Sequence, residues 1–277
     1  MRALVFAVAT AVTCSTTAFA QSRTIDQTLK LSPGGTLNLT ATKGSVRLTS
    51  WDRNEVQIRA RIEASSRWAD EYAKEAVEKT TVDISGDGQS VRIRSNYEAV
   101  PSRWTQWGRD SRTIPDIHYE IRAPKRIELR LDIDRSDSEI AGFAGRVTIE
   151  ADRSELRVSD IEGDLRVDID RGGRSRFANL RGSFSLEGDR TNLDLALAKL
   201  TDRSRLEIDR GDAEIRVAAG QALTLRTEIE RRGRFESEVP MEVEGGTSHS
   251  PEGTINGGGP TLTVIARRAR VELRKMI

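Results

Sequence analysis

Apolar and polar residues alternate through the second half of the chain, in a pattern that recurs every 18 to 21 residues. Each recurrence is marked by an acidic residue followed by arginine. The positions one, three and five before the acidic residue are mostly apolar, and those between are polar. An alternation with period two predicts a strand with one buried face. The marker pairs are Asp134-Arg135, Asp152-Arg153, Asp170-Arg171, Asp189-Arg190, Asp209-Arg210 and Glu230-Arg231.

Each repeat also contains a second, weaker strand after the arginine, for example around Leu156 and Val158. The small residue between the strands, Ser154 in this repeat, suits a tight corner. A glycine such as Gly163 marks the opposite corner. A unit this short cannot bury its own apolar face, but parallel stacking of successive units can. The pattern therefore predicts an all-β fold, a single-stranded parallel β-solenoid (β-helix) with coils of 18–21 residues.

Stacking would place the acidic residues of the marker pairs in one column, rung above rung. Neighbouring carboxylates about 4.8 Å apart repel by roughly 1 kcal/mol in water. The arginines can offset this repulsion, because a guanidinium group can bridge carboxylates of its own and the adjacent coil. The preferred interpretation is a self-neutralising structural ladder that sets the stacking register. The alternative is a surface for a divalent cation or another ligand, since hard cations favour clustered carboxylates.

The segment 21–123 is expected to cap the solenoid, and 124–277 to form its repeats and a C-terminal cap. No linker separates them, so 21–277 is predicted to be one continuous domain. One short helix is expected near the N-terminal end, and a Gly/Ser-rich loop at 245–259. The expected elements outside the repeats are strands at 36–42, 45–49, 56–62 and 118–122, a helix at 68–79, a hairpin of 82–84 with 91–93, a polar loop at 96–115, and last strands at 261–264 and 269–273.

The first twenty residues have the features of a secretory signal peptide. Arg2 is followed by an apolar stretch at 3–12, and Ala18-Phe19-Ala20 has the small-x-small cleavage pattern. The mature chain should then begin near Gln21 and be periplasmic or extracellular, at the cell surface. An apolar stretch this short cannot span a bilayer, and no transmembrane segment is expected. The weaker alternative is lipid attachment at Cys14, the single cysteine.

Composition and motifs favour neither nucleic-acid binding nor catalysis. The 44 Lys+Arg and 43 Asp+Glu residues nearly balance, whereas a nucleic-acid binder usually has a basic excess. Of the two histidines, His118 lies in an alternating strand and His249 in a Gly/Ser-rich loop, and no orienting acid marks a catalytic triad around either. We therefore expect no enzymatic activity, no cofactor, no catalytic residues and no metal site beyond the carboxylate alternative above.

Aromatic and basic residues gather in the polar loop before the repeats. Trp104 and Trp107, with Arg103 and Arg109 beside them, could stack on a sugar or a partner peptide. The alternative is that this loop covers the open end of the solenoid and its edge strand. The four residues are the candidate partner-binding site, and an envelope protein or a glycan is the expected partner.

Three motifs resemble a family of bacterial proteins of unknown function, the adhesin-like β-strand-repeat proteins of the DUF4097 type. The motifs are the segment 44–52 followed by Glu55-Val56, Ala123-Pro124-Lys125 before the repeats, and the glycine-rich segment 253–259 before Leu262-Thr263-Val264. The resemblance covers almost the whole mature chain and implies an extended envelope or surface protein. It transfers no catalytic residues. The family's corners resemble Ser-Gly-Asp, and the Asp-Arg corners of this chain depart from that pattern.

Together these observations predict an exported structural or interaction protein of the bacterial cell envelope. A first alternative is a glycan- or protein-binding module that uses the tryptophan loop or the charged ladder. A weaker alternative is a polysaccharide-active β-helix enzyme, which would break the repeat at one coil.

Overall fold

A computed structural model describes residues 22–64, 71–101, 103–104, 110–111, 114–230 and 232–276. The predicted signal peptide, 1–20, lies outside these residues. The described part is all-β apart from one short helix, α1 (Glu71–Lys79), as the sequence predicts. One large mixed sheet contains nineteen of the described strands, and β6 (Arg103–Trp104) pairs with β7 (Asp110–Ser111) separately. None of the helices in the described segments is long and apolar enough to cross a membrane.

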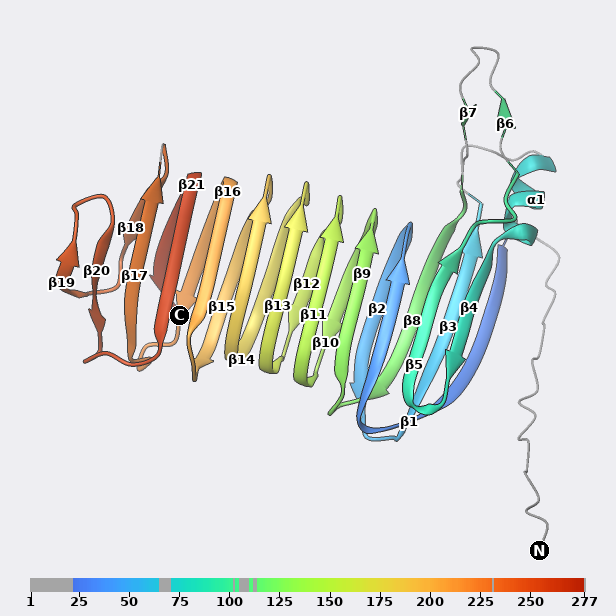
Figure 1. Ribbon diagram of the computed structural model, residues 1–277, viewed down its shortest axis with the longest axis horizontal. Coiled ribbons are helices and arrows are strands. Elements are labelled where there is room, and N and C mark those ends of the chain that lie inside the picture. Colours follow the sequence, from blue (N-terminus) through green and yellow to red (C-terminus); the bar gives the residue numbers. More distant parts are fainter. Residues whose placement is uncertain are drawn as a thin grey trace, which may run out of the picture.

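The large sheet forms two walls that enclose the core, and its strands run across the long axis of the molecule (Figure 1). In spatial order, wall A consists of β4 (Thr81–Gly86), β5 (Gly88–Asn96), the second half of β1 (Ser22–Ala41), β9 (Glu128–Asp134), β11 (Ala144–Asp152), β13 (Glu162–Asp170), the second half of β14 (Arg174–Asp189), the first halves of β16 (Ser204–Val217) and β21 (Thr261–Lys275), β17 (Leu223–Glu230), β20 (Pro251–Ile255) and β19 (Glu242–Gly246).

Wall B follows the same axis on the opposite side of the core. It consists of the first half of β1, β3 (Glu55–Glu63), β8 (Asp116–Pro124), β2 (Gly44–Trp51), β10 (Ser136–Ala141), β12 (Leu156–Ser159), the first half of β14, β15 (Asn192–Leu200), the second halves of β16 and β21, and β18 (Arg234–Ser237).

The central part of the molecule is a stack of coils in which each strand pairs in parallel with its equivalent in the next repeat. In wall A, Asp134 pairs with Asp152, Asp152 with Asp170, Asp170 with Asp189, and Asp189 with Asp209. The apolar positions before each aspartate point into the core: Leu131, Ile149, Val167, Leu186 and Leu206 are all at most 3% exposed. The alternation in the sequence therefore locates the buried face of each strand correctly.

The expectation of a sheet that is parallel throughout is wrong, because both ends are antiparallel. At the N-terminal end, residues 22–30 of β1 run antiparallel to β3, β3 runs antiparallel to β8, and β4 and β5 form the predicted hairpin. At the C-terminal end, β20 runs antiparallel to both β17 and β19. The segment 245–259, expected to be a loop, contributes to this second antiparallel group. A single-stranded parallel solenoid is therefore not confirmed for the whole chain.

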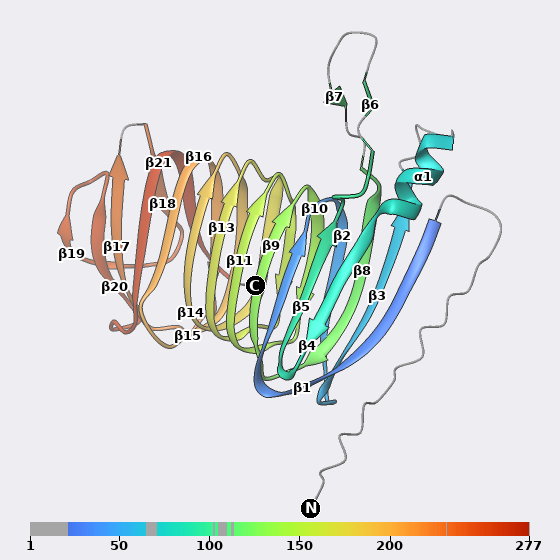
Figure 2. The same cartoon turned by 45° about the vertical axis from the view of Figure 1, so that its right-hand side comes forward.

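The order of strands in space differs from their order in the chain at the C-terminal end. Strand β21 is inserted between β16 and the pair β17 and β18, so the last strand of the chain is not the last of the stack. Figures 1 and 2 show β21, in red, next to β16, with β17 and the hairpin of β19 and β20 farther out. This insertion changes which side chains meet at the end of the ladder.

Candidate functional site

The corner between the two walls is made by the Asp-Arg pair itself. The arginine of each corner has a left-handed backbone, with φ between 49° and 60°. At the first four corners the backbone N–H of this arginine donates to the aspartate carbonyl of the next coil, as Arg153 does to Asp170 at 2.9 Å. The residues with this geometry are Arg135, Arg153, Arg171, Arg190 and Arg210, and Arg268 takes the same backbone conformation in β21.

The small residue after each arginine does not make the turn, contrary to the prediction. Ser136 and Ser154 are each 1% exposed and lie inside the stack. The Ser154 hydroxyl donates to the Asp152 carbonyl at 2.9 Å and accepts from the Ser136 backbone N–H at 3.0 Å. A small side chain is needed here to fit inside the corner, and its hydroxyl satisfies buried backbone groups. The opposite corner does use glycine as expected, and Gly163 has a φ of 134°.

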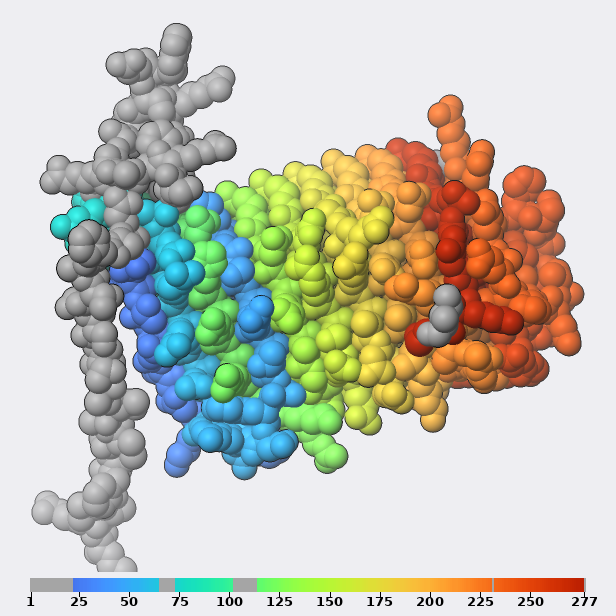
Figure 3. Space-filling model, turned by 180° about the vertical axis from the view of Figure 1, so that it is seen from behind, coloured from blue at the N-terminus to red at the C-terminus, as the bar shows by residue number. Residues whose placement is uncertain are grey.

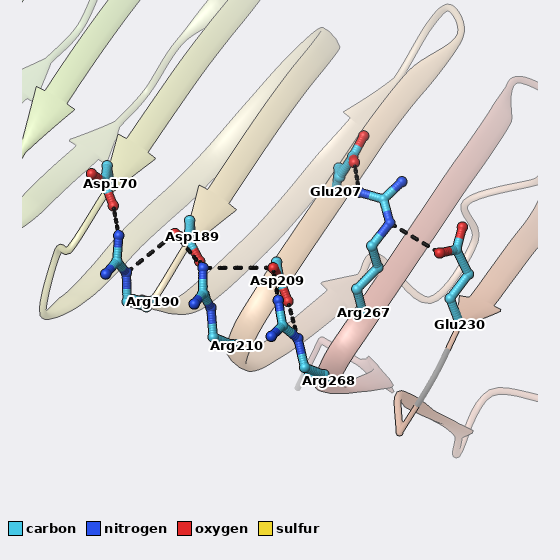
Figure 4. Close-up of polar contacts among 9 residues, drawn as sticks. All are labelled: Asp170, Asp189, Arg190, Glu207, Asp209, Arg210, Glu230, Arg267 and Arg268. Carbon is cyan, nitrogen blue, oxygen red and sulfur yellow. Dashed lines mark hydrogen bonds and ion pairs between the residues drawn. The ribbon is translucent and has the colours of Figure 1, made fainter.

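Four of the corner arginines contact two carboxylates each, one from their own coil and one from the preceding coil. Arg153 lies 2.9 Å from Asp152 and 3.2 Å from Asp134. Arg171 repeats the arrangement at 2.9 and 3.1 Å, with Asp170 and Asp152. Arg190 and Arg210 continue the arrangement (Figure 4). Arg190 lies 3.0 Å from Asp170 and 3.2 Å from Asp189. Arg210 lies 2.7 Å from Asp189 and 3.7 Å from Asp209. We call this row of side chains the Asp-Arg ladder.

The ladder has an arginine at each end. Arg135 contacts only Asp134 among the ladder carboxylates, at 2.9 Å. At the other end Arg268 contacts Asp209, with a distance of 3.0 Å from its Nε to Oδ1. Its five aspartates therefore alternate with six guanidinium groups, and each aspartate lies between two of them. Like-charge repulsion along the column is offset within the ladder itself.

The structure does not place Glu230 next to Asp209, as the repeat predicts, because β21 separates the two. Arg267 of β21 pairs in register with both Asp209 and Glu230. Its guanidinium group contacts Glu207 and lies 3.2 Å from Glu230, so one side chain joins β16, β21 and β17 (Figure 4). Burial alone would raise the pKa of Glu207, but hydrogen bonds from Arg205 and Arg267 lower it below its usual value of 4.5. Arg231 lies outside the described residues.

A second acidic column lies beside the ladder, two positions before each aspartate. Its member before Asp209 is Glu207, which has the ion pairs described above. The other members are exposed, and the described part of the chain supplies none of them with an ion pair; they are Asp132, Glu150, Asp168 and Glu187. No group of three or more acidic, histidine or cysteine residues in the described segments is placed to hold a metal ion. The described residues therefore provide no set of ligands for the divalent cation considered as an alternative role of the carboxylate columns.

Wall B carries a groove of about 720 Å³ that the sequence did not indicate. His118 lies in it, with Nδ1 2.8 Å from the Ser45 hydroxyl and Nε2 3.5 Å from Glu63. The lining alternates between basic and acidic side chains, among them Arg47 and Glu139, which lie 3.2 Å apart. The groove depends on the register of β3, β8 and β2, in which β8 pairs between two strands that follow each other in the chain. Only the alternation of the separate strands is visible in the sequence.

The tryptophan loop is described only in part. Trp107 and Arg109 lie outside the described residues, and of Arg103 and Trp104 only the backbone, in β6, is described. Both the partner-binding and the capping interpretation of this loop therefore stay predictions. His249, in the segment between β19 and β20, contacts the hydroxyl of Ser248 at 3.1 Å.

No family model matches the chain, and no curated protein matches it. Solved structures similar to it include a "putative cell adhesion protein" from Clostridium sporogenes, with 10% identity, 92% of this chain and 100% of that chain covered, and a TM-score of 0.37. A "putative adhesin" from Bacteroides fragilis has 9% identity, coverage of 92% and 97%, and a TM-score of 0.42. A "putative lipid binding protein" from Parabacteroides distasonis has 10% identity, coverage of 91% and 96%, and a TM-score of 0.42. Similarity at this level assigns neither a family nor a function.

Proposed function

We propose that the chain is an exported, non-catalytic structural and interaction protein of the bacterial cell envelope, in which residues 128–217 act as a rigid β-solenoid. The observation that carries this proposal is the Asp-Arg ladder. Its carboxylates and guanidinium groups are engaged with one another, rung after rung, so the ladder contributes a fixed stacking register and not a reactive group. The remaining exposed faces are then free for contacts with envelope components.

The regular repeat supports a scaffold over an enzyme. A catalytic centre needs one set of side chains with its own geometry, whereas the same Asp-Arg contact recurs in successive coils. A wide screen of envelope polysaccharides should therefore yield no cleavage products. Reproducible turnover by the purified chain, whether or not mutation of the ladder abolishes it, would contradict the non-catalytic assignment.

The test of the envelope role is location together with binding. The full chain, tagged at its C-terminus, should be recovered outside the cytoplasm with a new N-terminus near Gln21. The purified mature chain should co-sediment with cell-wall or outer-membrane fragments and not with neutral polymer beads. Retention of the uncleaved chain in the cytoplasm, or no sedimentation with either fragment, would refute the proposal.

A second candidate is a dedicated binding module, and the groove in wall B favours it. Replacement of Trp104 and Trp107 by alanine separates two versions of this candidate. Capture of envelope fragments should be lost if the tryptophan loop is the binding surface. It should be unchanged if wall B or the ladder face makes the contact. The ratio of bound to free chain in the sedimentation assay measures the difference.

A further inference from the structure

The outward-facing charged residues of wall B form a column that crosses every strand of the wall. Successive members are paired in register from one strand to the next. Their signs alternate without exception over the first six positions. The column reads Asp26, Arg59, Glu120, Arg47, Glu139, Arg157, Arg176, Asp194, Glu214, Glu272 and Glu236. Over the alternating part, each charge has opposite charges as its neighbours, which is the arrangement that stabilises a sheet surface.

The alternation ends where Arg157 of β12 pairs directly with Arg176 of β14. Both side chains are more than half exposed, and their nearest carboxylates lie at the limit of an ion pair, 4.0 Å away at Glu155 and 3.9 Å away at Asp194. Arg174, on the same face of β14, is exposed and has no ion pair with any described residue. Like charges directly opposite each other on a sheet are unfavourable. We call Arg157, Arg174 and Arg176 the arginine patch.

The acidic run that follows in the same column shows that such repulsion can be compensated within the chain. Arg216 contacts Asp194 and lies 3.7 Å from Glu214. Arg270 lies 3.0 Å from Glu272 and 2.8 Å from Glu236. Each of these carboxylates therefore has an arginine from a neighbouring column. The arginine patch lacks a comparable partner, and its charge remains available to a ligand.

We propose that the arginine patch binds an extended polysaccharide that carries carboxylate groups, such as a chain of uronic acid units. A guanidinium group can engage a carboxylate through two parallel N–H donors. Adjacent strands place two such groups about 4.8 Å apart along the molecule, a spacing comparable to the length of one sugar unit. This inference rests on the proposed envelope role, because it names a ligand class for the wall B surface.

The surroundings of the patch fit a flat polymer better than a nucleic acid. The next outward-facing positions along the strands are Ser159, Ala178 and Ala196, whose small side chains leave space beside the guanidinium groups. The exposed positions of β12, β15 and the first half of β14 include no aromatic side chain on which bases could stack. Arg157 also lines the end of the wall B groove, so a long polymer could continue from the patch into it.

The experiment is a calorimetric titration of the full mature chain with sodium polygalacturonate. Binding should be measurable at low salt and should weaken as the salt concentration rises. Simultaneous replacement of Arg157, Arg174 and Arg176 by glutamine should weaken binding by at least about tenfold, the effect of losing charge-assisted hydrogen bonds. Fully methyl-esterified polygalacturonate, which has no free carboxylates, should bind far more weakly than the free acid.

A matched control removes the same charge elsewhere. Arg92, Arg166 and Arg226 are exposed on wall A and have no ion pair among the described residues. Their replacement by glutamine should change the dissociation constant less than about twofold, whereas unspecific attraction would weaken with either triple variant. Equal loss in both variants, no heat of binding, or equal affinity for duplex DNA of the same charge would overturn the proposal. Co-sedimentation with envelope fragments would still decide the broader function independently.

Discussion

An arginine in a left-handed conformation is an expensive residue for a corner, because its Cβ crowds the following carbonyl oxygen. The cost is about 1 kcal/mol or more for a residue other than glycine. The ladder shows what offsets it: the left-handed backbone directs the Arg171 side chain toward both Asp170 and Asp152. Glycine would turn the corner without strain but could not neutralise the aspartate column. Arginine at the corner therefore strains the backbone, and its ion pairs with the aspartate column offset that strain.

Substitutions of Arg171 can separate these two contributions. Both Arg171→Ala and Arg171→Gly remove the ion pairs, but only alanine keeps the left-handed strain. The alanine variant should therefore be less stable than the glycine variant by about 1 kcal/mol, measured by urea denaturation. At Arg166, an exposed strand position, the order should reverse by about 0.5–1 kcal/mol because glycine weakens a strand. An alanine variant of Arg171 as stable as the glycine variant, with the expected order at Arg166, would show that the corner is not strained.

The opposite corner depends on the absence of a side chain. A Cβ added to Gly163 would lie 2.4 Å from the carbonyl oxygen of Gly145 in the adjacent coil, at a φ of 134°. Gly163→Ala should therefore lower the free energy of unfolding by about 2 kcal/mol or more. Gly220→Ala is the control, since no atom lies within 4 Å of the added Cβ. A Gly163 variant as stable as the Gly220 variant in urea denaturation would be incompatible with this close approach of the coils.

At the scale of elements, strand β21 is held by contacts with the strands on its two sides, β16 and β17. Its inward residues Leu262, Val264, Val271 and Leu273 are fully buried, and its Arg267 joins carboxylates on both sides. Fully burying an aliphatic side chain contributes about 1.5–3 kcal/mol, whereas a surface ion pair contributes at most about 1 kcal/mol. Burial therefore holds the strand in the sheet, and the charges specify its place between β16 and β17.

The pH dependence of stability should report this contact at Glu207. Its pKa is lower in the folded protein than its usual value of 4.5, so its stabilisation is present above that value and disappears as the pH falls through the lower, folded pKa. Glu207→Gln should cost about 1 kcal/mol at pH 7, and its difference from the wild type should vanish in acid. Glu150→Gln, which breaks no ion pair with a described residue, should change stability by less than about 0.5 kcal/mol at pH 7. A Glu207→Gln penalty in urea denaturation that persists unchanged in acid would refute the assignment.

The sequence predicted the repeating elements well because their physics is local. The alternation around Leu131 or Val167 needs only the neighbours in the chain to identify a buried face. The insertion of β21 was not predictable in this way, because Arg267 resembles any other surface arginine until its neighbours in space are known. The left-handed arginine was missed for a related reason: Ser154 has the better intrinsic tendency to form a turn, but its place inside the stack depends on tertiary packing.

At the scale of the whole molecule, the central coils form a nearly one-dimensional structure in which each coil contacts mainly its two neighbours. Stability in such a stack is approximately a sum of coil and interface contributions. The antiparallel strands at the two ends differ from these coils. In the space-filling view the central coils follow one another along the long axis in chain order, from green through yellow to orange (Figure 3). The stack should therefore tolerate a change in the number of central coils, provided that the register of the corners is kept.

Deletion of residues 153–170 tests this expectation directly, because it removes one repeat and joins Asp152 to Arg171. The new junction is again an Asp-Arg corner, and β11 can pair with the second half of β14 in the register that β13 now uses. We expect a cooperatively folded chain with unchanged β-type circular dichroism and a slightly smaller urea m-value, because less surface is exposed on unfolding. Deletion of residues 153–161 removes only half a coil, places wall B residues in wall A and should prevent folding. If the half-coil deletion folded as well as the full one, or if neither folded, the coils would not be the interchangeable units that their pairing indicates.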